Sequence, residues 1–198
     1  MKLAHREFWT NPMIAFITGV GVGMLAISIA GYRGMPSVIC LLGGAAVYAI
    51  FEYLVHRFLL HQLPRIAPAM HRGHAEHHRH PTEMEHLFSP LRYDLILYLG
   101  YSLFNLAVFR DWRLASAVVA GSALFQLYYQ WMHYSSHRPI KLITPWGRWM
   151  RKKHLLHHYL DEHAWYGVSH PVMDYLLGTS KPQPKNRGEQ GKQPPAVR

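Results

Sequence analysis

Cysteine and acidic residues are scarce in this chain of 198 residues. Its single cysteine, Cys40, lies in an uncharged run, so the chain can form neither an internal disulfide nor a cysteine-based metal site. Aspartate and glutamate number 11 against 21 lysines and arginines, which gives a formal net charge of +10. A charge of this sign suits a nucleic acid or an anionic membrane surface as partner.

Charged residues are absent altogether from two long stretches near the N-terminus, residues 8–32 and 34–51. About 20 apolar residues are enough to cross the hydrocarbon core of a membrane. The mean hydropathy of -0.08 conceals these runs, because the histidines and a polar C-terminal tail offset them. The first run could instead be a cleaved signal peptide, since it has a basic start and small residues near Ala30. Its length, and Glu7 in its flank, favour a retained anchor.

Two more uncharged runs follow, residues 95–109 and 114–132, joined by a short polar link. The first has only 15 residues, which is short for a span. We therefore predict four membrane spans, at about residues 10–32, 37–55, 94–109 and 114–133. None has an ionisable residue at its centre, which argues against a transporter, because transport pathways need such residues near mid-bilayer.

The distribution of lysine and arginine predicts the orientation of these spans. Four spans place residues 1–7, residues 57–93 and the part after residue 133 on one side, with 2, 5 and 11 lysines and arginines respectively. The other side has only Arg33, Arg110 and Arg113. By the positive-inside rule, the rich side and both termini are cytoplasmic. The cations follow loops and do not form a basic face with stacking aromatic residues, so we expect no nucleic-acid partner.

Histidine, by contrast, is abundant, with 16 residues. Ten of them form four short motifs: His56-x4-His61, His74-x2-His77-His78, His133-x3-His137 and His154-x2-His157-His158. Histidine is the commonest protein metal ligand, and residues three and four apart share one face of a helix, so each triplet can present three imidazoles to one point. Because one zinc site takes about four ligands, we predict that two metal ions share the ten. Imidazole alone suits iron, zinc, copper and nickel about equally.

The first motif does not fit a regular helix. At about 100° per residue, His56 and His61 would lie about 140° apart. Either the helix ends or bulges between them, or the two residues serve different metals. Pro64 and Pro68 predict that the helix ends soon afterwards. All four motifs fall on the predicted cytoplasmic side, next to the ends of the spans, although nothing in the ligand argument requires it.

Metal-bound imidazoles usually donate their other N–H to a nearby acceptor. The candidates for this role, or for lining the site, are Glu52, Glu76, Tyr129, Asp161 and Asp174. The spacing His71-x2-His74 is also typical of ligands, but only His74, His77 and His78 give the x2-His-His pattern. The histidines outside the motifs are interpreted as surface residues or as neighbours of the ligands. They include His5, His71, His80 and His86.

The order of the four motifs resembles that of the fatty acid hydroxylase and sterol desaturase superfamily. Residues 166–179, YGVSHPVMDYLLGT, are similar to the segment that follows the last histidine motif there. The resemblance covers about residues 50–180, and the four motifs together make it specific. The third motif, with its x3 spacing, favours the fatty acid hydroxylase and sterol desaturase branch over the short carotene hydroxylases. His170 stands where relatives often carry a small residue, so it is not counted among the ligands.

The resemblance implies an all-α integral membrane protein: a four-helix bundle with a cytoplasmic, helical, histidine-rich cap that binds metal. Residues 1–180 would form this single hydroxylase domain, and the composition of residues 181–198 predicts a disordered basic tail. The implied activity is O2-dependent hydroxylation of a lipid C–H bond by two iron ions, with zinc possible in an inactive or as-purified form. The lipid comes from the bilayer and the electrons from a separate electron-donor protein. No catalytic residue is expected outside the metal ligands.

Three alternatives remain open. A sterol desaturase-like or a carotenoid hydroxylase-like oxidoreductase would use the same metals and differ in its product. A non-catalytic membrane zinc-binding protein would use the same histidines without chemistry. The mass of the product distinguishes the first two from fatty acid hydroxylation, and an absence of any product would favour the third.

Overall fold

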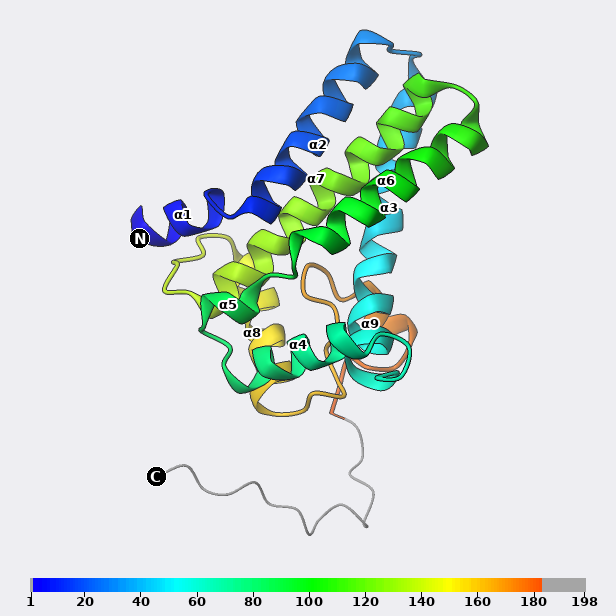
Figure 1. The fold of residues 1–198 in the computed structure, drawn as a ribbon. Helices are drawn as coiled ribbons and strands as arrows, with labels where there is room; N and C mark the ends of the chain where they lie inside the picture. Colours follow the sequence, from blue (N-terminus) through cyan, green and yellow to red (C-terminus); the bar gives the residue numbers. More distant parts are fainter. Residues whose placement is uncertain (1, 183–198) are drawn as a thin grey trace, which may run out of the picture.

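The computed structural model describes residues 2–182, and within them every regular element is a helix (Figure 1). In chain order the elements are α1 (Lys2–Trp9), α2 (Pro12–Ala30), α3 (Met35–Leu54), the π-helix η1 (Val55–Gln62), α4 (Pro68–Arg79), α5 (Met84–Leu87), α6 (Leu91–Phe109), α7 (Trp112–His137), α8 (Pro145–Tyr159) and α9 (Val172–Leu176). The all-helical class predicted from the sequence is confirmed. The predicted tail, residues 181–198, lies almost entirely outside the described residues.

Four long helices, α2, α3, α6 and α7, run alongside one another, and α7 packs against the other three (Figure 1). The shorter elements η1, α4, α5, α8 and α9 gather with their loops at the end where α3 and α7 finish, and we call this part the cap. In α7, residues 115–123 are buried on every side of the helix. They are Ala, Val, Ser and Gly, whose small side chains let neighbouring helices approach closely.

Two glycines bring α3 and α7 into backbone contact. A Cβ atom on Gly44 would lie 2.0 Å from the carbonyl oxygen of Val118, and one on Gly121 would lie 1.9 Å from that of Leu41. No larger residue fits at either position unless the helices move apart. Ser122 adds a hydrogen bond across the same contact, because its hydroxyl donates to the carbonyl oxygen of Gly44 at 2.8 Å.

Helix α6 begins at Leu91, earlier than the span predicted at residues 94–109, and therefore includes Asp94 in its first turn. The Asp94 carboxylate is buried against α7 and accepts the side-chain N–H of Gln126 at 2.6 Å. The amide oxygen of Gln126 in turn accepts the hydroxyl of Tyr98 at 2.7 Å. A buried carboxylate is tolerated when it is hydrogen-bonded, so the helix can extend beyond the uncharged run.

Two helical segments are long and apolar enough to cross a membrane. They are Pro12–Ala30 and the continuous segment Met35–Gln62, with mean hydropathies of 2.2 and 2.0. Among the described residues α6 and α7, the other two predicted spans, do not reach the same hydropathy. Large apolar side chains are nevertheless exposed along α2, α3 and α6, for example Ile29, Ile39 and Ile96. Extensive exposed apolar surface is typical of faces that contact a membrane or a partner, and these faces indicate a membrane protein.

Candidate metal centre

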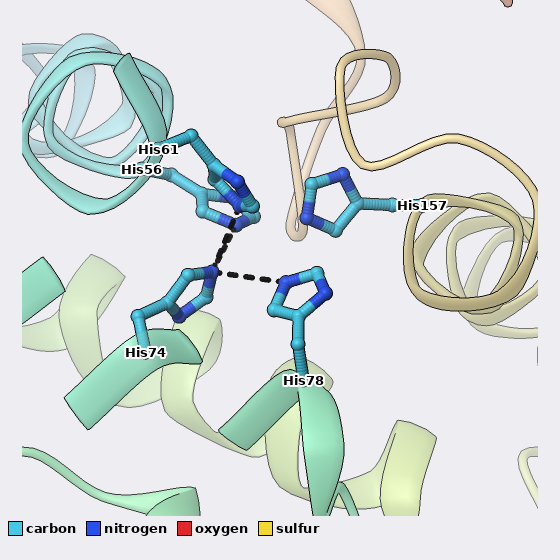
Figure 2. A group of neighbouring side chains, drawn as sticks. All are labelled: His56, His61, His74, His78 and His157. Atoms are coloured by element: carbon cyan, nitrogen blue, oxygen red, sulfur yellow. Dashed lines mark hydrogen bonds between the residues drawn. The ribbon is translucent and has the colours of Figure 1, made fainter. Parts of the chain in front are cut away.

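The ten motif histidines form two groups of five, and within each group one ring nitrogen per residue lies within 4.8 Å of all the others. We call the first the η1 group, and it consists of His56, His61, His74, His78 and His157 (Figure 2). The second, the α7 group, consists of His77, His133, His137, His154 and His158. Both groups lie in the cap or at its junction with α7. The sequence predicted that ten histidines would share two positions, and the geometry supports this division.

The triplets on α4 and α8 are each split between the two groups. His74 and His78 belong to the η1 group, whereas His77 between them belongs to the α7 group. On α8, His154 and His158 belong to the α7 group, whereas His157 between them belongs to the η1 group. Residues three and four apart lie about 60° and 40° to opposite sides of the first residue, so they diverge. Our expectation that each triplet would present three imidazoles to one point was therefore wrong.

The π-helix brings the two histidines of the first motif together. In a π-helix the hydrogen bonds join residues five apart, as the bond from the N–H of Leu63 to the carbonyl oxygen of Phe58 does at 2.7 Å. Residues five apart then lie on one face. The ring centroids of His56 and His61 are 5.1 Å apart, and both rings point to one centre (Figure 2). Of the alternatives that the spacing left open, the helix bulges and both residues belong to the same group.

In the η1 group more ring nitrogens converge on one atom than hydrogen bonding alone explains. In the η1 group, Nε2 of His74 lies 3.1 Å from that of His56, 2.9 Å from that of His61 and 3.1 Å from that of His78. One neutral ring nitrogen carries at most one proton, so it cannot bond with three others at once. Two nitrogens that bind one ion at about 2.1 Å and at right angles would be about 3.0 Å apart. The donor set therefore fits a metal ion.

In the α7 group the ring nitrogens approach one another in two pairs. Nε2 of His133 lies 2.9 Å from that of His77, and Nε2 of His137 lies 2.8 Å from that of His154. Within the described residues, both ring nitrogens of His158 are buried without a hydrogen-bond partner. A buried polar atom without a partner is rare in native proteins and is explained where an ion binds it.

Burial keeps the motif imidazoles of α4 and α8 neutral. It lowers the pKa of His78 to about 3, and it lowers the pKa values of His154 and His157 well below their ordinary value. Neighbouring imidazoles lower these pKa values further, because positive charges so close together would repel one another. The neutral form is the one that binds a metal.

Backbone carbonyl groups orient two histidines of the η1 group. Nδ1 of His56 donates to the carbonyl oxygen of Tyr166 at 2.6 Å, and Nδ1 of His157 donates to that of Ala164 at 2.8 Å. A proton on Nδ1 leaves the Nε2 lone pair free to face the centre. The sequence predicted carboxylates for this role. It missed these acceptors because every residue has a carbonyl group, and no residue type marks one.

Two of the predicted carboxylates instead hold the loop that presents these carbonyl groups. Glu52 accepts the backbone N–H groups of Val168 and Ser169 at 2.8 and 2.9 Å, and also the Ser169 hydroxyl. Asp174 accepts the N–H groups of Tyr166 and Gly167, both at 2.9 Å. Both side chains are buried. Their contribution to the histidines is indirect, through the position of residues 164–169, which we call the carbonyl loop.

The other candidates have different surroundings. Tyr129 stacks on His133 with ring centroids 6.1 Å apart and planes at 8°. Glu76 lies on the outer side of α4 and pairs with Arg79, and Asp161 accepts the N–H of His163 at 3.0 Å. Glu162, which the sequence did not single out, lies 4.0 Å from Nδ1 of His61.

The histidines outside the four motifs lie outside both groups. His71 donates to the carbonyl oxygen of Leu60 at 2.7 Å, and His170 donates to that of Ala49 at 3.1 Å. His80 and His86 lie beside Glu83 at 3.4 and 3.9 Å. His5 stacks on a tryptophan, Trp131.

The sequence model of the fatty acid hydroxylase family matches residues 41–179, a range that includes both histidine groups. The chain therefore belongs to this family, as the motif order indicated. Together with the histidine groups, membership of this hydroxylase family indicates a metal centre.

Several relatives share this region. The dihydroceramide fatty acyl 2-hydroxylase FAH1 of Arabidopsis thaliana is 26% identical over 190 residues, with 92% of this chain and 77% of the relative covered. The human fatty acid 2-hydroxylase is 26% identical over 151 residues, with 71% and 39% covered. The ceramide very long chain fatty acid hydroxylase SCS7 of Saccharomyces cerevisiae is 32% identical over 183 residues, with 89% and 46% covered. The chain thus spans less than half of the human and yeast relatives.

A solved structure has the same fold. It is described as full-length scs7p with only the hydroxylase domain visible, and it superposes with a TM-score of 0.77 at 27% identity. The match covers 90% of this chain and 69% of the other. The arrangement of long helices and cap is therefore shared with a known hydroxylase domain.

Proposed function

We propose that this protein is a membrane lipid hydroxylase that uses O2 and a dinuclear iron centre held by the ten histidines. The observation that carries this proposal is the division of the ten into two groups of five, each with nitrogens converging within 4.8 Å. The relatives named above, which are fatty acid or ceramide hydroxylases, support lipid hydroxylation.

Two bound iron ions would supply the activation of O2 that inserts one oxygen atom into an unactivated C–H bond. The protein's own residues hold the ions and keep water from them. His77, His154 and His157 are almost completely buried, which serves both purposes. We assign no acid or base beyond the proposed metal ligands.

We place four helices, α2, α3, α6 and α7, across the membrane, with the cap and both termini in the cytoplasm. The exposed apolar side chains of α2, α3 and α6 support the crossing. The excess of lysine and arginine on the cap side supports the orientation. A lipid substrate would then enter sideways from the bilayer, with its chain between the long helices.

We propose acyl carbon 2 as the position that is hydroxylated. The Arabidopsis and human relatives are named as 2-hydroxylases. Carbon 2 is adjacent to the carboxyl or amide group of an acyl chain, so the polar end of the substrate would lie next to the metals. The histidine groups lie where the long helices meet the cap, which suits a substrate whose polar end is at the membrane surface and whose chain is in the bilayer.

The electrons would come from a separate donor protein. Hydroxylation places one atom of O2 in the product and the other in water, and this requires two electrons and two protons. Helix α8 has four lysines and arginines and no acidic residue. Arg148, Arg151 and Lys152 line a groove of about 470 Å³ on the opposite side of α8 from its histidines. This surface suits an acidic donor.

The decisive experiment supplies isotope-labelled O2 to membranes that contain the protein and analyses the lipids by mass spectrometry. We expect one labelled oxygen atom on carbon 2 of an acyl chain. Loss of two hydrogen atoms without label would identify a desaturase. Absence of any product, together with stably bound zinc, would favour the binding protein.

A further inference from the structure

We infer that the two metal positions are unequal: the carbonyl loop preorganises the η1 group, which therefore binds its ion first and more tightly than the α7 group. This inference rests on the proposed use of the ten histidines as ligands. It adds an order of metal binding and assigns a role to Trp165.

The two groups differ in the partners of their outward-facing nitrogens. In the η1 group, His56 and His157 donate from Nδ1 to carbonyl oxygens at 2.6 and 2.8 Å. In the α7 group, Nδ1 of His77 and of His154 and both ring nitrogens of His158 are buried without a hydrogen-bond partner in the described part of the chain. In that group His133 has such a partner, at the backbone of Leu87. Because such partners fix the ring and its tautomer, the η1 group needs less rearrangement to bind an ion.

Trp165 connects the two carbonyl groups. Its φ of 56° lies in the left-handed region, which is unusual for a residue with a Cβ atom. This turn of the backbone directs the carbonyl groups on either side, those of Ala164 and Tyr166, to two histidines of one group. Trp165 itself is held by hydrogen bonds from its backbone N–H to Thr179 at 2.8 Å and from its indole N–H to Ser180 at 2.7 Å.

The loop is also anchored to two helices. Glu52 of α3 and Asp174 of α9 accept four of its backbone N–H groups, at 2.8 to 2.9 Å. The hydroxyl groups of Tyr53 and Thr179 lie 2.8 Å apart and link α3 to the end of the described chain. A loop with this many buried hydrogen bonds keeps its shape whether or not an ion is bound, so Trp165 is a positioning residue for the η1 group.

The test is a zinc titration of the purified, metal-free protein in competition with a chromophoric chelator. We expect two classes of site in the parent, with the first ion bound at least tenfold more tightly. Trp165→Ala should weaken the first ion about 10- to 100-fold and leave the second unchanged. Trp165→Gly is the matched variant, because it loses the same indole but adopts a positive φ without strain, and it should weaken the first ion less. Equal binding of both ions by the parent, or equal weakening of both by Trp165→Ala, would overturn the inference.

A second pair of variants serves if Trp165→Ala does not fold. His137→Ala removes a member of the α7 group and should retain one tightly bound ion. His56→Ala removes a member of the η1 group and should retain only a weakly bound ion. If both variants retain an ion of the same affinity, the positions are equal. Because zinc binding is measured without turnover, this result is separate from the lipid analysis that tests the proposed function.

Discussion

The long helices and the cap bury different kinds of side chain. Where α3 and α7 cross, the interior consists of small residues in backbone contact, and large apolar side chains face outward. In the cap, the most deeply buried residues include His77, His154 and His157. Several ring nitrogens there lack a partner within residues 2–182. The difference teaches that the long helices can associate through their own contacts, whereas we expect the histidine-bearing helices of the cap, α4 and α8, to depend on bound metal for their stability.

Metal removal should therefore destabilise the cap more than the long helices. If the metal is present at about 1,000 times its dissociation constant, its loss costs about 4 kcal/mol of stability. We expect faster hydrogen exchange in α8 after chelation and little change in α2, as measured by mass spectrometry of their peptides. An equal increase in both helices would show that the cap does not depend on metal more than the rest of the molecule.

Single changes within the histidine groups should have the next largest effect. His77→Ala, His137→Ala and His157→Ala each remove a nitrogen that no neighbour replaces, so activity and metal content should fall at least about 10- to 100-fold. His80→Ala and His86→Ala are matched controls in the same cap and should be close to the parent. Metal analysis of the parent should give two ions per chain. Full activity in His137→Ala would contradict the dinuclear proposal.

The stability of the long helices should be most sensitive to substitution where α3 and α7 are in backbone contact. Gly44→Ala places a methyl group against the Val118 carbonyl and should lower the free energy of unfolding by about 1 to 3 kcal/mol. Gly43→Ala is the neighbouring control, because its added Cβ meets no atom within 4 Å. Thermal unfolding in detergent measures the difference. Similar midpoints for the two variants would show that α3 and α7 do not depend on this contact.

Reversal of one charge on α8 should affect electron supply and leave both regions folded. We expect Lys152→Glu to raise the KM for an acidic electron donor about threefold or more at low ionic strength, with less effect at high salt. Arg72→Glu introduces the same change in charge on α4 and should have a smaller effect. If the two variants behave alike, the α8 surface is not the docking site.

The smallest expected effect concerns α1, which lies between the two regions. Hydrogen bonds from Arg138 and Tyr134 lower the pKa of Glu7 below its ordinary value of 4.5, because they outweigh partial burial, which raises it. Because the folded-state pKa is lowered, the stabilisation is complete above pH 4.5 and disappears as the pH falls through the folded-state value. Glu7→Gln should cost about 0.5 to 1 kcal/mol at neutral pH and nothing in acid. A cost that is independent of pH would exclude the charge as its cause.

The sequence predicted the members of the site better than their arrangement. Spacing singled out the ten histidines that the structure brings together, because residues three or four apart share a face of a helix; only His56 and His61, five apart, fell outside this rule. It did not predict that His77 and His157 would join the opposite group, because that depends on how α4 and α8 face each other. Nothing in the sequence marked the carbonyl groups of Ala164 and Tyr166 as partners of the histidines, because every residue has such a group. The sequence did not predict that α6 begins at Leu91, because Asp94 interrupts the uncharged run. Its burial is explained only by the hydrogen bond with Gln126 of α7.

The division of the α4 and α8 triplets limits how the metal positions can move. His77 and His78 are consecutive in the chain yet belong to different groups, and the same is true of His157 and His158. Consecutive Cα atoms are held about 3.8 Å apart by covalent bonds. The two groups are thus joined twice by single peptide units, and neither α4 nor α8 can shift relative to one group alone. If the two groups hold the proposed ions, we expect bending of the long helices to move both positions together.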